Sequence, residues 1–71
     1  MKIRYTKHGD ERLKQRRISK RDVKAAIDFG RKSDASGGSR KSTHKNQNGA
    51  LVVIYNIRSS SSVEIITAYY E

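Results

Sequence analysis

Residues 50–57, ALVVIYNI, and residues 63–70, VEIITAYY, are the two main apolar stretches of the chain. The first is nearly all apolar and rich in β-branched side chains, which is typical of a central strand covered on both faces. The second alternates with a period of two, so that one face of a strand would carry Val63, Ile65, Thr67 and Tyr69. Four serines, Ser59–Ser62, separate the stretches, and we therefore expect a hairpin with a flexible serine loop.

Two weaker strands are expected before this hairpin, within the polar stretch 31–48. We place them at about 32–36 and 40–46, with Gly37-Gly38 as the turn between them. Asn48-Gly49 predicts a type I′ turn into the central strand, because that turn needs residues that tolerate a positive φ. The side chains expected to be most deeply buried lie on the two apolar strands: Val52, Val53, Ile54, Ile65 and Ile66.

Two helices are predicted near the start of the chain. Thr6 is a suitable N-cap for a helix over 7–17, which has acidic residues in its first turns and arginines in its last. Ser19, with an acid three residues later, matches the capping signal of a second helix over 20–29, and Gly30 ends it.

The predicted fold is a single α+β domain spanning residues 1–71, with two N-terminal helices packed on a three- to four-stranded antiparallel sheet. Residues 1–5 form a short stretch that suits an extended conformation, with Ile3 and Tyr5 on one face. The core must be small, because a chain of this length buries only about 60% of its unfolded surface. The chain has no cysteine, so neither a disulfide nor a thiolate metal site can supplement that core.

The chain is strongly basic, and its charge is unevenly distributed. Sixteen Lys and Arg against seven Asp and Glu give +9, of which +7 falls on residues 1–31 and +2 on residues 32–71. This asymmetry favours a nucleic acid as partner, with an acidic protein as the next candidate and a generic solubilising surface as the plain alternative. A membrane partner is not expected, because no broad apolar face accompanies the charges. The cations expected to bind nucleic acid are Lys7, Arg12, Arg16, Arg17 and Lys20.

His8, Arg12 and Arg16 are spaced four residues apart, so on a helix they share one stripe about 12 Å long. Guanidinium groups hold a phosphate by paired hydrogen bonds, and an imidazole exchanges a proton near neutral pH. The stripe suits a phosphodiester, although a solvated basic face with an incidental histidine explains the same spacing. Neither His8 nor His44 has the neighbouring ligand residues of a metal site, and no metal or cofactor is expected. No serine lies in a nucleophile motif, so serine nucleophile chemistry is not expected either.

Five short motifs follow one another along the chain: His8-x-x-x-Arg12-x-x-x-Arg16, Arg17-Ile18-Ser19, Asp22-Val23, Gly30, and Ile65-Ile66-Thr67-Ala68-Tyr69. In this order they resemble a small bacterial family, domain-of-unknown-function family 4258. The resemblance covers essentially the whole chain. Arg17 stands where many members of that family carry glycine, a departure that touches the turn between the helices.

The family has been grouped with the barnase, EndoU, colicin and RelE superfold of small ribonuclease toxins. The resemblance therefore implies that fold and a metal-independent endoribonuclease activity toward RNA. It also implies a toxin-like role, with an acidic immunity protein or antitoxin as partner. The lack of cysteine fits a cytoplasmic site of action, reached by a stand-alone protein or by the end of a longer delivered toxin. The residues that it marks as catalytic are His8, Arg12, Arg16, Thr67 and Tyr69.

In such an enzyme the 2′-hydroxyl attacks the adjacent phosphate and the 5′-oxygen leaves. His8 would be the general acid or base, and the two arginines would clamp the phosphorane. Thr67 would donate a hydrogen bond to a phosphate oxygen, and Tyr69 would position the ribose or carry the second proton. Thr67 and Tyr69 fit equally well as plain β-formers near the end of a strand. Two other functions stay open: a non-catalytic nucleic-acid-binding module or toxin–antitoxin component, and an accessory domain that binds an acidic protein.

Overall fold

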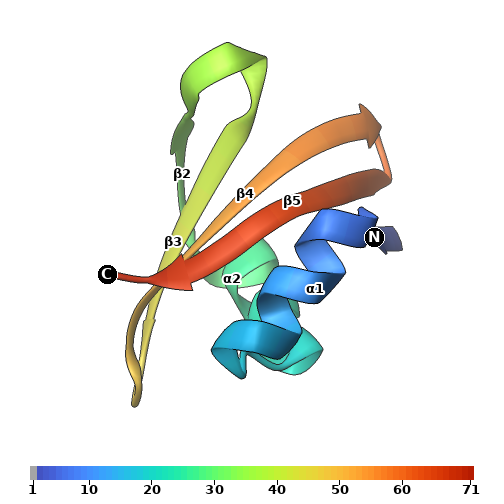
Figure 1. Cartoon of the computed structure of the whole chain (residues 1–71). Helices are drawn as coiled ribbons and strands as arrows, with labels where there is room; N and C mark the ends of the chain where they lie inside the picture. The colour runs from blue at the N-terminus through green and yellow to red at the C-terminus, as the bar shows by residue number, and fades with distance from the viewer. Residues whose placement is uncertain (1) are drawn as a thin grey trace.

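The computed structural model describes residues 2–71 and contains two α-helices and a five-stranded sheet (Figure 1). In chain order the elements are β1 (Lys2–Tyr5), α1 (Lys7–Arg16), α2 (Lys20–Phe29), β2 (Arg31–Asp34), the short 3₁₀ turn η1 (Ser36–Gly38), β3 (Arg40–Asn46), β4 (Gly49–Ser59) and β5 (Ser62–Tyr70). The α+β class and both helices are confirmed. The four predicted strands are also present, with ends that differ from the expected ones by at most about two residues.

The sheet differs from the expected one in size and in one pairing. It has five strands in the order β1-β5-β4-β3-β2, and β1 runs parallel to β5 while the other neighbours are antiparallel. Pairing Ile3 with Val63 and Tyr5 with Ile65 places both β1 side chains against the core. A four-residue strand with two apolar side chains carries too weak a signal to reveal its partner, so the expectation of a purely antiparallel sheet of three or four strands was wrong.

Side-chain caps fix the start of both helices, as predicted. The Thr6 hydroxyl accepts a hydrogen bond from the Gly9 N–H at 2.8 Å, and the Ser19 hydroxyl accepts one from the Asp22 N–H at 3.1 Å. Each cap satisfies one of the backbone donors that a helix N-terminus leaves without an intrahelical partner.

The first helix ends one residue earlier than expected, because Arg17 adopts the left-handed conformation with a φ of 56°. This conformation lets the Ile18 N–H bond to the Leu13 carbonyl at 2.9 Å, which turns the chain sharply toward α2. Glycine is the residue that adopts this conformation at least cost, so Arg17 holds the turn at some expense in backbone energy.

The turn between β3 and β4 lies one residue earlier than predicted. Asn46 pairs with Gly49, so the loop is Gln47-Asn48 rather than Asn48-Gly49. The side chain of Asn46 accepts a hydrogen bond from the Asn48 N–H at 2.8 Å and so replaces the expected turn geometry. A type I′ turn needs positive φ at both central residues, and among residues 2–71 Arg17 is the only non-glycine with positive φ.

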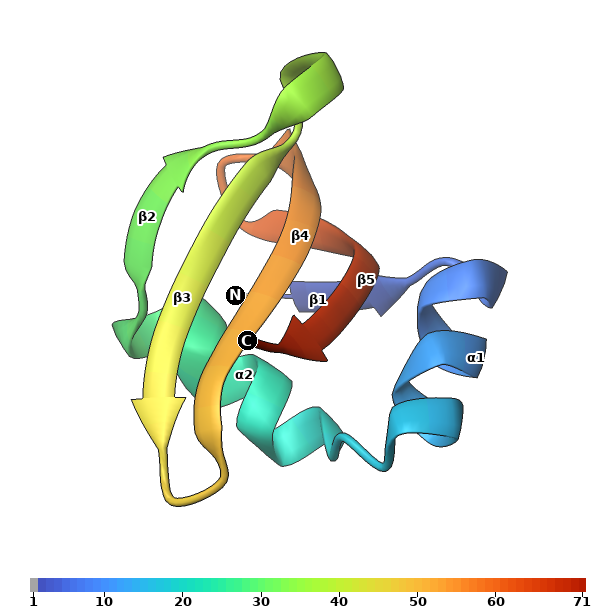
Figure 2. The ribbon, with the colours of Figure 1, turned by 60° about the vertical axis from the view of Figure 1, so that its left-hand side comes forward.

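One face of the sheet packs against the helices and holds the core. We call it the helix-covered face; it carries Ser42, Leu51, Val53, Tyr55 and Ala68. We call the opposite side the open face; from the strand register it carries Arg31, Ser33, Lys41, Thr43, Val52, Ile54, Thr67 and Tyr69. In Figure 2 β3 and β4 lie in front of α2, and no helix covers them on the viewer's side.

Three of the five side chains expected to be most buried are fully buried, namely Val52, Val53 and Ile65. Ile54 and Ile66 are only half-buried, which corrects the expectation for both. Ile54 points to the open face between Lys41 and Thr67, whereas Val52, on the same face between Thr43 and Tyr69, is fully buried. Ile66 has no partner residue on β4, because the register passes from the pair Ile54 and Thr67 directly to the pair Tyr55 and Ile65. This β-bulge removes Ile66 from the alternation that the period-two pattern assumed.

Candidate nucleic-acid interface

Arg16 and Thr67, predicted as site residues from opposite ends of the sequence, are in contact. The Arg16 Nη1 donates to the Thr67 hydroxyl at 3.2 Å and to the Ala68 carbonyl at 2.8 Å. Arg16 itself is exposed, and both bonds use the same nitrogen. Its Nη2 and Nε therefore stay available to an incoming group, held in place by the anchored end of the guanidinium.

The position of α1 beside β5 explains why Arg16 reaches this strand. β1 stops pairing with β5 at Ile65, so the outer edge of β5 beyond that residue is bordered by α1 instead of a strand (Figure 1). Both the N–H and the hydroxyl of Thr6 donate to the Ile65 carbonyl at 3.2 Å. Gly9 allows the close approach, since a Cβ there would lie 2.6 Å from that same carbonyl oxygen.

The rest of the predicted stripe does not converge on this contact. The His8 side chain is 78% exposed, and its Nδ1 lies 4.0 Å from the Glu11 carboxylate. Arg12 donates to the Gln15 side chain at 3.3 Å. Eight residues of helix separate His8 from Arg16 by about 12 Å along the axis. The helix thus offers a line of groups that suits several phosphates of one strand, rather than one cluster around a single phosphate.

On the open face the strand register aligns four side chains in a row that leads to Arg16. Ser33 pairs with Lys41, Lys41 with Ile54, and Ile54 with Thr67. Tyr69 lies on the same face, two residues beyond Thr67, and pairs with Val52 in the next row. Sequence reasoning missed Lys41, because the signal that places it is the β3–β4 register, which the sequence did not reveal.

A hollow of about 380 Å³ lies over this part of the open face. It is lined by Asp34, Ala35, Ser36, Lys41, Ile54 and Tyr69. Residues 34–36, from the end of β2 to the first residue of η1, therefore form one wall, and β3, β4 and β5 contribute one side chain each. The hollow combines an aromatic ring, an aliphatic side chain, an ammonium group and the Asp34 carboxylate, two residues along β5 from the Arg16–Thr67 contact.

The open face carries three cations, namely Arg31, Lys41 and, two residues beyond Thr43 on β3, Lys45. The nearby carboxylates are already paired, since Asp34 lies 3.5 Å from the Arg40 Nε and Glu64 lies 2.5 Å from the Arg58 Nη2. In the part of the chain that the structure describes, no carboxylate lies within 4.0 Å of Lys41. This charge distribution attracts a polyanion to the open face.

Lys7 and Lys20, also predicted to bind nucleic acid, lie in a separate groove. It is lined by Lys2, Ile3, Arg4, Tyr5, Thr6, Lys7, Asp10 and Lys20. The Lys20 Nζ lies 4.7 Å from the centre of the Tyr5 ring and 3.6 Å from the Asp10 carboxylate. A hydrogen bond from Lys14 is the main cause that holds the pKa of Asp10 below its usual value, while burial and the Asp10 charge raise the pKa of Tyr5. The groove thus joins Lys7 of α1 to Lys20 of α2, and Arg17 is exposed at the turn between the two helices.

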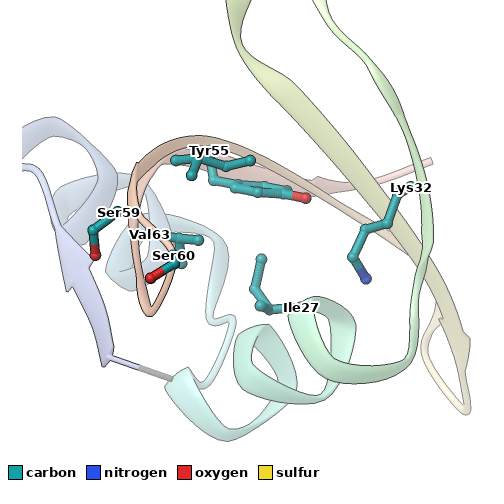
Figure 3. A pocket seen from close by; sticks show the side chains of 7 residues that line it. Ile27, Lys32, Tyr55, Ser59, Ser60 and Val63 are labelled. Atoms are coloured by element: carbon teal, nitrogen blue, oxygen red, sulfur yellow. The ribbon is translucent and has the colours of Figure 1, made fainter.

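An apolar pocket of about 260 Å³ lies on the opposite side of the sheet, between α2 and the β4–β5 turn (Figure 3). Its lining residues are Ile27, Lys32, Tyr55, Ile57, Ser59, Ser60 and Val63. In Figure 3 the Tyr55 hydroxyl points toward the end of the pocket that holds Lys32. The Lys32 ammonium donates to the Gly30 and Ala26 carbonyls at 2.9 and 3.5 Å, and burial lowers its pKa. The one cation of this pocket is therefore already bound to the end of α2.

Within residues 2–71, no three His, Asp or Glu side chains come close enough together to hold a metal ion. Neither described helix has the length and apolar character needed to cross a membrane.

Comparison with known proteins places the chain in a family. Neither a curated protein nor a solved structure matches it. The family model of the domain of unknown function DUF4258 matches residues 5–70, which include both helices, four of the five strands and every residue predicted to be catalytic. The chain therefore belongs to the DUF4258 family.

Proposed function

We propose that this chain is a metal-independent endoribonuclease that binds RNA across α1 and the open face of the sheet. The observation that carries the proposal is the contact of Arg16 with Thr67 and with the Ala68 carbonyl. It fixes a guanidinium beside a hydroxyl at the border of a cation-rich face. Such a pair of preorganised donors suits a phosphate oxygen that gains negative charge during the reaction.

In the proposed reaction the ribose 2′-oxygen attacks the adjacent phosphorus and forms the 2′-O–P bond. The P–O5′ bond then breaks, which leaves a 2′,3′-cyclic phosphate on one product and a 5′-hydroxyl on the other. The 2′-hydroxyl proton passes to a general base, and a general acid protonates the leaving 5′-oxygen. Arg16 and Thr67 donate to the non-bridging oxygens, and Arg12 neutralises the neighbouring phosphate one helical turn away.

Two side chains are candidates for the proton transfers. Tyr69 belongs to the open face, two residues beyond Thr67 on the same strand, which is about 7 Å along β5. His8 lies about 12 Å from Arg16 along the helix, so it acts on the substrate only where the strand extends along α1. In this role the protein would act as a toxin, and an acidic immunity protein or antitoxin would cover the same cations.

The test is RNA cleavage by the purified chain in EDTA, with the Thr67→Val, Tyr69→Phe and His8→Ala variants beside it. Each variant removes one proposed donor or proton carrier, and circular dichroism checks that each still folds. We expect the parent chain to release products with a 2′,3′-cyclic phosphate. We expect Tyr69→Phe or His8→Ala to be slower by about 10²–10⁴-fold if that group carries a proton. No cleavage by the parent, or equal rates for all four proteins, would refute the nuclease.

A second function, a non-catalytic RNA-binding module, is favoured by one observation. His8 is 78% exposed and does not contact the Arg16–Thr67 pair. In that case the arginines contact phosphates only, and His8→Ala should leave the RNA affinity unchanged. Binding without cleavage in the experiment above would select this function.

A further inference from the structure

We infer that the hollow on the open face binds the base of one unpaired nucleotide, so that the chain selects single-stranded RNA. The inference rests on the proposed binding of RNA but not on its cleavage. The hollow is lined by Lys41, Ile54 and Tyr69 together with residues 34–36, and it lies beside the Arg16–Thr67 contact.

The lining offers what a nucleobase needs. Tyr69 contributes an aromatic ring and Ile54 an aliphatic surface, and both are half-buried on a face that no helix covers. Bases stack on aromatic side chains with a contribution of about 1–3 kcal/mol each. Val52 on the same face is fully buried and the other side chains there are polar or charged, so this is a site for one base rather than a platform for several.

The distances across the sheet match one nucleotide. Lys41 and Thr67 are separated by β4 alone, so their backbones lie about 10 Å apart. Tyr69 lies two residues beyond Thr67 on β5, which is about 7 Å along the strand. A phosphate held by Arg16 and Thr67 therefore places a base attached to the same stretch of backbone within reach of Tyr69 and Lys41.

Two charged side chains line the hollow, and Asp34 already lies 3.5 Å from the Arg40 Nε, so we expect the free Lys41 ammonium to decide which base edge is preferred. Lys41 has donors and no acceptor, and no carboxylate of the described chain lies within 4.0 Å of it. A lysine pairs best with the O6 and N7 acceptors of guanine. In an A-form duplex the base faces are stacked and the deep groove is closed to side chains, so only an unpaired base can enter the hollow.

The test uses a 2′-O-methyl oligonucleotide about eight nucleotides long, which cannot undergo attack by its own 2′-oxygen. Each base in turn is replaced by an abasic residue, which keeps every phosphate, and affinity is measured by fluorescence anisotropy. We expect removal of one base to weaken binding about 10-fold, and removal of the others to matter little. Annealing the oligonucleotide to its complement should abolish the part of the affinity that depends on this base.

Variants assign the effect to the hollow. Tyr69→Leu keeps an apolar side chain without a stacking ring, and should make intact and abasic oligonucleotides bind equally. Tyr69→Phe should retain the difference, because it loses only the hydroxyl. Lys41→Gln should reduce the preference for guanine over adenine, whereas Lys45→Gln, the matched charge change on the same face, should not.

The outcomes separate this inference from the proposed function. The base site is refuted if every abasic oligonucleotide binds as tightly as the intact one, or if the oligonucleotide does not bind at all. It is also refuted if the difference between intact and abasic oligonucleotides persists in Tyr69→Leu. A base-dependent affinity without cleavage of ordinary RNA supports the base site and refutes only the nuclease.

Discussion

The two faces of β4 differ in what covers them, although their residues alternate along one strand. Leu51 and Val53 point to the helix-covered face, where both are fully buried in the core. Ile54 points the other way and is half-buried, in a row that runs from Lys41 to Thr67. One face has the apolar contacts that hold a small domain together, and the other has exposed cations and a hollow. Stability and binding are therefore assigned to different sets of residues, which separate variants can test.

The largest expected effect is on the helix-covered face. Leu51→Ala removes a fully buried side chain and should lower the free energy of unfolding by about 2–5 kcal/mol. A domain of this size has only a few kcal/mol of stability, so much of this variant should be unfolded. Ile54→Ala, on the open face, should cost less than about 2 kcal/mol. Urea denaturation followed by circular dichroism measures both losses in the free energy of unfolding. Equal losses in the two variants would contradict the assignment of stability to the helix-covered face.

The next effect concerns the Arg16–Thr67 contact. Thr67→Val keeps shape and strand propensity but removes the hydroxyl that Arg16 contacts, so RNA cleavage should slow by about 10²-fold or more. Thr43→Val makes the same change on the same face, in the row that pairs Thr43 with Val52. Single-turnover rates should be unchanged in this control. An equal loss of cleavage rate in both variants would show that the substitutions act on the sheet as a whole and not on the Arg16–Thr67 contact.

A smaller effect is expected on the salt dependence of binding. Arg12→Ala removes one proposed phosphate contact, so the slope of log affinity against log salt should fall by about 0.7 for single-stranded RNA. Lys24→Ala removes the same charge from α2, where Lys24 pairs with Asp28 at 2.6 Å. Its slope should match that of the parent chain in anisotropy titrations. Equal changes in the two variants would show that net charge, and not a phosphate contact of Arg12, decides the affinity.

The smallest effect is at the turn between the helices, outside both faces. Arg17→Gly relieves the positive φ of a side-chain-bearing residue and should stabilise the chain by about 1 kcal/mol. Thermal unfolding measures this gain. Arg17 was also predicted to bind nucleic acid, so the salt slope should fall by about 0.7, as for Arg12→Ala, and an unchanged slope would place this turn outside the interface.

Local signals in the sequence were sufficient for most of the fold. The Thr6 and Ser19 caps, the apolar run of β4 and the serine loop each depend on neighbouring residues, and each was predicted. The parallel β1–β5 pair and the bulge at Ile66 depend on contacts between distant segments, which a period-two pattern does not contain.

The candidate site shows the same limit. Arg16 and Thr67 were named from a helical stripe and a family motif, but their contact depends on how α1 lies against the free edge of β5. Lys41 could not be named at all, since its row on the open face exists only through the β3–β4 register. Helical spacing grouped His8 with Arg16 correctly on one helix, and it could not show that Arg16 is anchored to a strand while His8 is exposed.

The most direct test of the central claim is methyl NMR of the chain titrated with the 2′-O-methyl oligonucleotide. The open face carries the methyl groups of Ile54 and Thr67, and the apolar pocket on the other side carries those of Ile27, Ile57 and Val63. Binding on the open face predicts that the Ile54 and Thr67 signals shift with the ligand while the three pocket signals stay in place. Shifts confined to Ile27, Ile57 and Val63 would contradict the account, because they would put the RNA on the helix-covered side.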